Sequence, residues 1–187
     1  MDGNLEAFNS LVDCYQSAVY SLSYRLLGNR EAAEDAAQET FLSAFRALGR
    51  FAGGNFRSWL LRIAANECKD ELRRRKRKDA LSLDEIFGRT ESPIEIHHPS
   101  ERAEIRVEEH EMSAGIERIL LNLPFEQRQA ILLVDIYDFH YEEVATMTLS
   151  SIGTIKSRIH RGRQRLRELF ESHPELFEGA DRREDQR

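Results

Sequence analysis

The chain has 187 residues, of which 41% are hydrophobic and 32% charged, so it can bury one moderate core or two small ones. Glycine and proline are sparse and helix formers are abundant, which predicts an all-α protein. The net charge of −6 excludes a uniformly basic nucleic-acid binder, and no stretch approaches the roughly 18 apolar residues of a membrane span. The amino terminus lacks a basic segment followed by an apolar run, so we expect a cytoplasmic protein.

The chain begins with two predicted helices joined by a tight turn at Gly28 and Asn29. One apolar stripe marks the first helix, at Leu5, Phe8, Val12, Tyr15, Val19, Leu22 and Leu26. Asn29 can cap the second helix, residues 30–48. Its expected buried positions are Ala33, Ala37, Phe41, Ala44 and Leu48. Its other side carries Glu34, Asp35, Gln38, Glu39 and Leu42, and these residues by themselves indicate only a solvated acidic face.

A third helix is predicted over residues 56–77, with Asn55 as its cap. Its expected core residues are Phe56, Leu60, Ile63, Ala64 and Leu72. Seven cations and two acids lie in residues 69–78. Because this exceeds what a helix C-terminus requires, it favours a nucleic-acid contact. Trp59 fits either a core position or a ring that stacks on an unpaired base.

Charge and proline content then indicate a linker. Residues 79–111 hold ten acids and three arginines, and Pro93 and Pro99 accompany the loss of apolar period. We therefore expect a flexible acidic linker over residues 79–110 between two helical domains, residues 1–78 and 111–172. The apolar period resumes at Ile116, Ile119, Leu120 and Leu123. Pro124 suits the first turn of a helix that buries Ile131, Leu132, Val134 and Ile136, and residues 173–187 predict a frayed tail.

Residues 141–167 indicate a helix-turn-helix. Val144, Ala145 and Met147 give its first helix an apolar face, which Ser150, Ser151 and Gly153 are expected to interrupt. The buried stripe of its second helix is expected at Ile152, Ile155, Ile159 and Leu166. Six cations and no acid lie in residues 151–167, a footprint typical of DNA binding, with a solvated basic helix on acidic neighbours as the alternative. Side chains near the helix start, where base edges are reached, are Thr154, Ser157 and Arg158.

Nothing in the chain favours catalysis or metal binding. Cys14 and Cys68 form no CxxC pair, so we expect buried or inert thiols. His97 and His98 have no companions at metal-ligand spacing. The sequence has no paired carboxylates and no nucleophile with a nearby base at spacings typical of an active site. We therefore expect no enzyme activity, no metal, no cofactor and no small-molecule substrate.

Three blocks in order resemble the extracytoplasmic-function sigma factors of the sigma-70 family, two-domain subunits that direct bacterial RNA polymerase to promoters. The blocks are AEDAAQETFLSAFRAL (33–48), FRSWLLRIAANECKDELRRRKR (56–77), and LPFEQRQAILLVDIYDFHYEEVA with GTIKSRIHRGRQRLRE (123–145 and 153–168). The resemblance covers about residues 5–170. It implies that residues 1–78 are sigma region 2 and residues 111–172 sigma region 4.

The resemblance also implies roles for particular residues. The second helix would bind the core polymerase, made of beta-prime and beta subunits, through Glu34, Asp35, Gln38, Glu39, Phe41 and Leu42. The third helix and its preceding loop would recognise and melt the minus 10 element through Phe51, Asn55, Trp59, Asn66, Lys69, Arg73 and Arg74. The last helix would read the minus 35 element through Thr154, Lys156, Ser157, Arg158, Arg161 and Arg163. The acidic linker would run through the polymerase toward the RNA exit path.

The turn of the helix-turn-helix departs from the family pattern, which usually has glycine followed by an apolar residue where this chain has Leu149 and Ser150, and leucine where it has Thr148. A non-glycine residue in left-handed backbone costs about 1 kcal/mol, so we expect a turn of different shape. By resemblance we also expect a signal-responsive protein held by an anti-sigma factor. The alternative is a helix-turn-helix regulator that acts without polymerase, which would leave residues 34–41 and the basic cluster at 69–78 unexplained.

Overall fold

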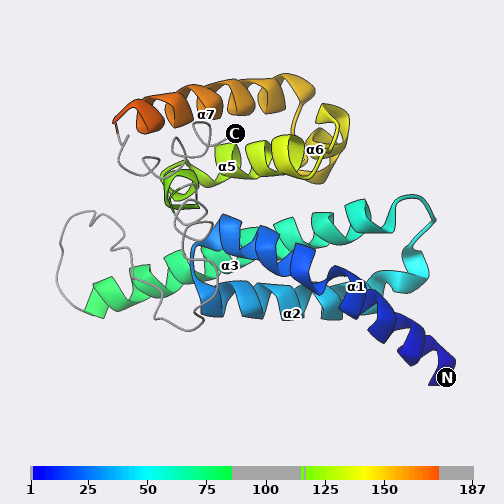
Figure 1. The fold of residues 1–187 in the computed structure, drawn as a ribbon. Coiled ribbons are helices and arrows are strands. Elements are labelled where there is room, and N and C mark those ends of the chain that lie inside the picture. Colours follow the sequence, from blue (N-terminus) through cyan, green and yellow to red (C-terminus); the bar gives the residue numbers. More distant parts are fainter. Residues whose placement is uncertain (1, 86–114, 116, 173–187) are drawn as a thin grey trace, which may run out of the picture.

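The computed structural model describes residues 2–85, 115 and 117–172, and all its regular structure there is helical (Figure 1). The predicted all-α class with two helical domains is confirmed. Most of the predicted linker and the whole predicted tail, with His97, His98 and Ile116, lie outside the described residues.

The first domain consists of three helices, α1 (Asp2–Leu27), α2 (Arg30–Ala47) and α3 (Phe56–Glu85), which pack against one another. Gly28, at φ 68, ends α1 in left-handed backbone, and Asn29 then caps α2 by accepting a hydrogen bond from the Ala32 amide. Of the predicted α1 stripe, Phe8, Val19, Leu22 and Leu26 are buried. The local signals therefore located the first turn correctly.

The buried face of α2 differs from the prediction. Its buried residues are Ala32, Ala33, Ala36, Thr40 and Ala44, so Ala33 and Ala44 are confirmed. Ala37 and Phe41 are only half-buried, at the edge facing α1. Leu48 lies in a short 3₁₀ turn, Leu48–Arg50, beyond the helix end. α2 has alanines on the predicted side and also on the adjacent side, at Ala32 and Ala36, so either side allows close helix packing. The neighbouring helices α1 and α3 pack against the side with the smaller side chains, which replaces Ala37 and Phe41 by Ala36 and Thr40.

The helix α3 begins where predicted, with the Asn55 side chain accepting a hydrogen bond from the Ser58 amide. It continues to Glu85, so the first residues of the predicted linker are helical. Its buried residues are Leu60, Leu61, Ala64, Ala65 and Cys68. The predicted core residues Phe56, Ile63 and Leu72 are half-buried.

The second domain contains a helical turn at residues 117–121, then α5 (Phe125–Ile131), a π-helix (Leu132–Ile136), α6 (Tyr141–Met147) and α7 (Ile152–Ser172). The predicted core residues Ile119, Leu120, Leu123, Ile131 and Leu132 are buried. Ile136 is 41% exposed, so that prediction was wrong, while Tyr137 is buried. The wider π turn explains the change of face, because its backbone hydrogen bonds join residues five apart instead of the four of an α-helix.

The helix-turn-helix is confirmed, with corrections at Ile152, at Gly153 and at Leu166, which is only half-buried. Val144, Ala145, Met147, Ile155 and Ile159 are buried as predicted. Ile152 is 39% exposed, and Gly153 lies within α7 instead of interrupting it. Gly162, which was not predicted, is buried where α7 packs on α5; a Cβ there would lie 2.5 Å from Ile131 Cδ1. Leu149 takes the left-handed position of the turn, at φ 52.

Candidate nucleic-acid and protein interfaces

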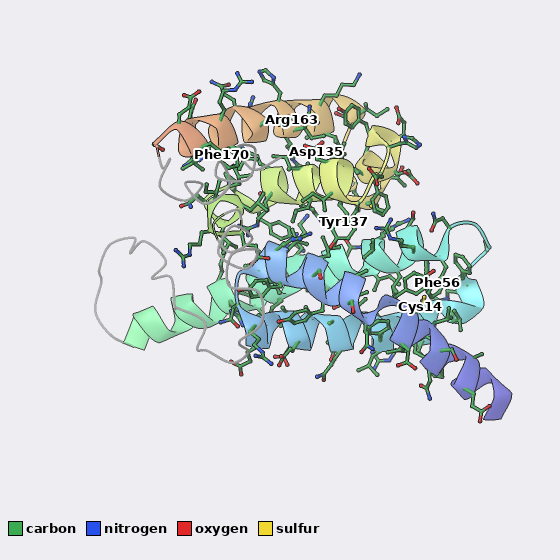
Figure 2. The ribbon with its side chains drawn as sticks, viewed as in Figure 1. Cys14, Phe56, Asp135, Tyr137, Arg163 and Phe170 are labelled. Atoms are coloured by element: carbon green, nitrogen blue, oxygen red, sulfur yellow. The ribbon has the colours of Figure 1, made fainter. Side chains whose placement is uncertain are left out.

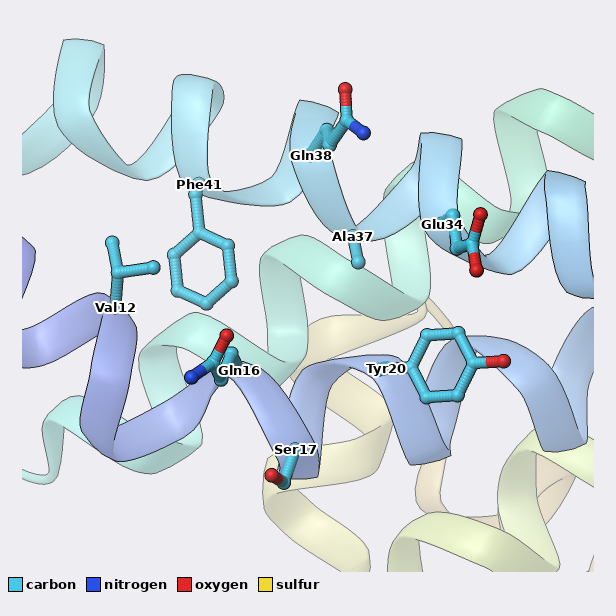
Figure 3. Close-up of a pocket in the computed structure, with 8 residues that line it drawn as sticks. All are labelled: Val12, Gln16, Ser17, Tyr20, Glu34, Ala37, Gln38 and Phe41. Carbon is cyan, nitrogen blue, oxygen red and sulfur yellow. The ribbon is translucent and has the colours of Figure 1, made fainter. Parts of the chain in front are cut away.

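The acidic side of α2 borders a pocket of about 440 Å³ between α1 and α2 (Figure 3). Glu34, Asp35, Gln38, Glu39 and Leu42 are exposed, as expected for an interaction surface, and Phe41 is half-buried in the pocket wall. The opposite wall comes from α1, through Val12, Gln16, Ser17 and Tyr20. This wall was not predicted, although Val12, Gln16 and Tyr20 are spaced four residues apart and so share one side of the helix.

Apolar side chains extend this surface beyond the pocket. Leu42 is 48% exposed and Phe45 is 47% exposed. Phe45 lies edge-on to Phe8 of α1, with ring centroids 5.0 Å apart. Phe45 is one turn beyond Phe41 and Leu42, so helical spacing could have identified it. We call the exposed residues Glu34, Asp35, Gln38, Glu39, Leu42 and Phe45, together with the pocket, the α2 surface.

The start of α3 carries an aromatic cluster. Phe51, Phe56 and Trp59 are mutual neighbours, with ring centroids 5.1 to 5.7 Å apart. Trp59 therefore has a packing role, and it is also half-exposed. The loop before it places Gly53 and Gly54 at φ 93 and 96, backbone that side chains other than glycine rarely adopt. Asn55 is exposed, and its side chain is engaged as the helix cap.

Further along α3, the predicted DNA-contacting side chains Asn66, Arg73 and Arg74 are exposed and Lys69 is half-buried. Arg73 pairs with Asp70 at 3.1 Å, and Arg74 pairs with Glu71 at 3.1 Å. The exposed Arg73–Asp70 pair contributes at most about 1 kcal/mol, whereas the Glu71 side chain is only 12% exposed and also pairs with Arg75. Arg73 can therefore exchange its partner for a phosphate at low cost.

The predicted DNA-reading residues of α7 divide into exposed and engaged side chains. Thr154, Lys156 and Arg161 are exposed, and Ser157 is half-buried. Ser151 caps the helix by accepting a hydrogen bond from the Thr154 amide at 3.0 Å. The exposed side chains that are predicted to read DNA therefore begin with Thr154, in the first turn of α7.

Two arginines of α7 are held by neighbouring segments. Arg158 donates a hydrogen bond to Ser150 Oγ at 3.1 Å, which ties the helix to the turn before it. Arg163 makes a paired contact with Asp135 of the π-helix (Figure 2), and this hydrogen bonding raises the pKa of Arg163. Sequence spacing could not indicate either contact, because the Asp135 contact spans 28 positions and the Ser150 contact depends on the turn geometry.

The two cysteines lie in different environments. Cys68 is fully buried, and burial raises the pKa of its thiol to about 12. Cys14 is exposed, so burial does not protect it. Within the described residues, no group of three or more candidate ligands could hold a metal ion. No described helix has the length and apolar character needed to cross a membrane.

The second domain is a helix-turn-helix whose last helix is basic, as is typical of DNA-binding proteins, and the first domain carries the exposed acidic and apolar α2 surface. Comparison with known proteins agrees: residues 11–78 match Sigma-70 region 2, and residues 113–166 match Sigma-70, region 4. The chain therefore belongs to the extracytoplasmic-function (ECF) RNA polymerase sigma factors of the sigma-70 family. Sigma factors act in transcription initiation and are not enzymes.

Individual relatives support this membership. The chain is 37% identical over 169 residues to the ECF RNA polymerase sigma factor SigW of Bacillus subtilis, covering 88% of this chain and 89% of that protein. It is 37% identical over 173 residues to SigE of Mycolicibacterium smegmatis, covering 90% of this chain but only 63% of that longer protein. The solved structure of RpoE in complex with the anti-sigma factor NepR, from Bartonella quintana, matches with a TM-score of 0.67 and 29% identity over 89% of this chain and 98% of that chain.

Proposed function

We propose that this chain binds the RNA polymerase core through the α2 surface and directs it to promoters that α3 and α7 recognise. The observation that carries the proposal is that the α2 surface and the basic side of α7 are both exposed and lie on separate domains (Figure 1). One protein can therefore contact polymerase and duplex DNA at the same time.

Polymerase binding would use both charge and apolar burial. Glu34, Asp35 and Glu39 are exposed acids that can accept hydrogen bonds from basic side chains of the beta-prime clamp helices. Leu42 and Phe45 supply apolar area, whose burial stabilises a complex by roughly 25 cal/mol per Å² before association costs. The pocket beside Phe41 is suited to one partner side chain of moderate size.

DNA recognition would divide between two helices. Thr154, Lys156 and Arg161 of α7 are exposed, and Thr154 and Arg161 share the side of the helix that would enter the major groove at the minus 35 element. At the minus 10 element, Phe51 and Trp59 offer aromatic faces for unpaired bases. Unstacking one base costs a few kcal/mol, which base–aromatic stacking and phosphate contacts offset.

Regulation and location are part of the same proposal. A structural relative is held by an anti-sigma factor, and we propose that such a factor, responding to a stress or other signal, also controls this chain. A polymerase subunit of this kind works where the polymerase and chromosome are, so we assign it to the cytoplasm. The domain boundaries at residues 78 and 110 also belong to this proposal.

The test is run-off transcription by core polymerase on a promoter library, with two double variants and matched controls. Asp35→Ala/Gln38→Ala should weaken core binding, whereas Asp13→Ala, an exposed acid of α1 outside the pocket, should not. Lys156→Ala/Arg161→Ala should weaken binding at the upstream element, whereas Arg118→Ala should not. We exclude Arg158 from this test because its contact with Ser150 also supports the turn.

Each outcome decides between the functions considered. Specific initiation that depends on both surfaces supports the proposal. A chain that binds specific duplex DNA but never associates with core polymerase contradicts it, and supports a helix-turn-helix regulator that acts without polymerase.

A further inference from the structure

The turn between α6 and α7 holds Ser150 in a fixed position. The Ser150 amide donates a hydrogen bond to the Ala145 carbonyl at 2.9 Å, which spans the left-handed Leu149 and closes the end of α6. The Ser150 hydroxyl donates to the Thr148 carbonyl at 3.3 Å. Both the backbone and the side chain of Ser150 are therefore held, and the hydroxyl oxygen can still accept a hydrogen bond.

Arg158 of α7 uses this acceptor. Its Nη1 donates a hydrogen bond to Ser150 Oγ at 3.1 Å, and the Arg158 side chain is half-buried beside the turn. A free arginine side chain has many rotamers, and each hydrogen bond that orders it removes some of that freedom. The contact with Ser150 therefore limits the orientations of the guanidinium before any DNA arrives.

Arg158 also lies on the side of α7 that would face DNA. Thr154, Arg158 and Arg161 are spaced four and three residues apart, so they share one side of the helix. The buried Ile155 and Ile159 mark the side that packs on the rest of the domain. The guanidinium that Ser150 holds thus belongs to the same side as the exposed Thr154 and Arg161.

The two held arginines of α7 differ in the atoms that their contacts use. Asp135 accepts from both Nε and Nη2 of Arg163, the edge of a guanidinium that binds two acceptors at once, and its carboxylate offsets the charge. Ser150 is neutral, and within the part of the chain that the structure describes it accepts from Nη1 of Arg158 alone. Arg158 therefore keeps its charge and its Nε–Nη2 edge for another partner.

We propose that Ser150 is a positioning residue that directs Arg158 toward a guanine of the minus 35 element. Guanine presents two acceptors, N7 and O6, in the major groove, and a bidentate arginine is their commonest specific partner. This inference rests on the proposed function, because it specifies how α7 distinguishes one base from the others.

The physical reason is preorganisation. An arginine that is already oriented loses less freedom when it binds guanine, so this base pair is bound more tightly. At a site without guanine, an unrestrained arginine can turn to a phosphate, whereas one that Ser150 holds reaches such alternatives less readily. The Ser150 hydroxyl therefore increases the difference in affinity between guanine and the other bases.

Two variants that differ by a single hydroxyl test this role. Ser150→Thr keeps an acceptor for Arg158, whereas Ser150→Val has almost the same shape as threonine and no acceptor. The full chain, alone and with core polymerase, would be used to select duplexes whose minus 35 element is randomised, and the bound duplexes would be sequenced. Thermal unfolding followed by circular dichroism checks that each variant is folded.

Wild type and Ser150→Thr should prefer guanine at one position of the element. Ser150→Val should lower that preference about fivefold, the factor that one neutral hydrogen bond is worth, and should change preferences elsewhere by less than about twofold. A purely structural role of the turn would instead weaken binding to every sequence alike. That uniform loss, or an equal guanine preference in the valine and threonine variants, overturns the inference.

A double-mutant cycle shows whether Ser150 acts through Arg158. Arg158→Ala alone should abolish the guanine preference at the same position. In that background, Ser150→Val should change the preference by less than about twofold, because the hydrogen bond that it removes is already lost. A further loss of about fivefold would mean that Ser150 acts through another residue, which also overturns the inference.

Nuclear magnetic resonance tests the positioning without DNA or polymerase. The ¹⁵N relaxation of Arg158 Nε in the free chain should show a more ordered side chain in wild type and Ser150→Thr than in Ser150→Val. Equal order in the threonine and valine variants overturns the positioning role even if transcription is normal.

The experiments also separate this inference from the proposed function. If the chain selects duplexes but never associates with core polymerase, the proposed function is wrong, and a guanine preference that depends on the Ser150 hydroxyl still supports the inference. If neither the chain alone nor its mixture with core polymerase selects any sequence, both are overturned.

Discussion

Replacing Leu149 with glycine should stabilise the helix-turn-helix. Leu149 is 93% exposed and has φ 52, so its side chain contributes almost no burial while its backbone is strained. Left-handed backbone costs a non-glycine residue about 1 to 2 kcal/mol. Glycine loses roughly 0.5 to 1 kcal/mol through the entropy of the unfolded chain. The net expectation for Leu149→Gly is a gain of about 0 to 1.5 kcal/mol, centred near 0.75 kcal/mol.

Urea and thermal unfolding followed by circular dichroism would measure this gain as a higher midpoint, by a few degrees in the thermal experiment. The matched control is Thr146→Gly, at an exposed position of α6 whose hydroxyl donates to the Glu142 carbonyl at 2.9 Å. Glycine there should cost roughly 0.5 kcal/mol, because the backbone is helical. If Leu149→Gly destabilises the protein as much as Thr146→Gly does, the argument from backbone strain is refuted.

Three further predictions concern side chains whose partners the structure defines. Asp135→Asn should release Arg163 and remove a negative charge beside α7. The affinity for duplex DNA should therefore rise, and its salt dependence should steepen by the equivalent of up to about one phosphate contact. Unchanged binding would show that Arg163 does not reach DNA. Iodoacetamide at pH 8 should modify Cys14 and spare Cys68, because burial raises the pKa of Cys68 to about 12; mass spectrometry of the folded chain checks this, and equal modification would contradict it. Asn55→Ala should lower the free energy of unfolding by about 1 kcal/mol through loss of the α3 cap, and no change in the urea midpoint would mean that water replaces it.

The raised pKa of Cys68 has a definite consequence for stability. The folded-state pKa lies above the ordinary value of 9.0, so the protonated thiol favours the folded state below about pH 9. That contribution is lost as the pH rises toward 12. Wild type and Cys68→Ala should therefore differ in stability by a pH-dependent amount only above about pH 9.

Local signals predicted most helix boundaries, because caps and apolar periods depend on residues a few positions apart. Asn29 and Asn55 cap the helices that follow them, as their positions indicated. The errors at Phe41, Ile136 and Ile152 have a different origin. Each error concerns which side of a helix faces its neighbour, and helical spacing alone does not decide this. For Phe41 the choice lay between two alanine-rich sides of α2, for Ile136 a π-helix shifted the buried side, and Ile152 lies in an exposed first turn.

The sequence by itself determined the class of protein, because charge and motif order are properties of the chain: an acidic block, a basic helix and a helix-turn-helix in succession. The tertiary structure alone decided which of these residues are free to act. Leu26 and Arg128 are 102 positions apart, yet they share a buried hydrogen bond, and Arg163 is engaged by Asp135 from another helix. The pocket beside Phe41 likewise exists only because α1 supplies its second wall. Contacts between distant segments depend on how the helices pack, and that packing is what spacing along one helix does not specify.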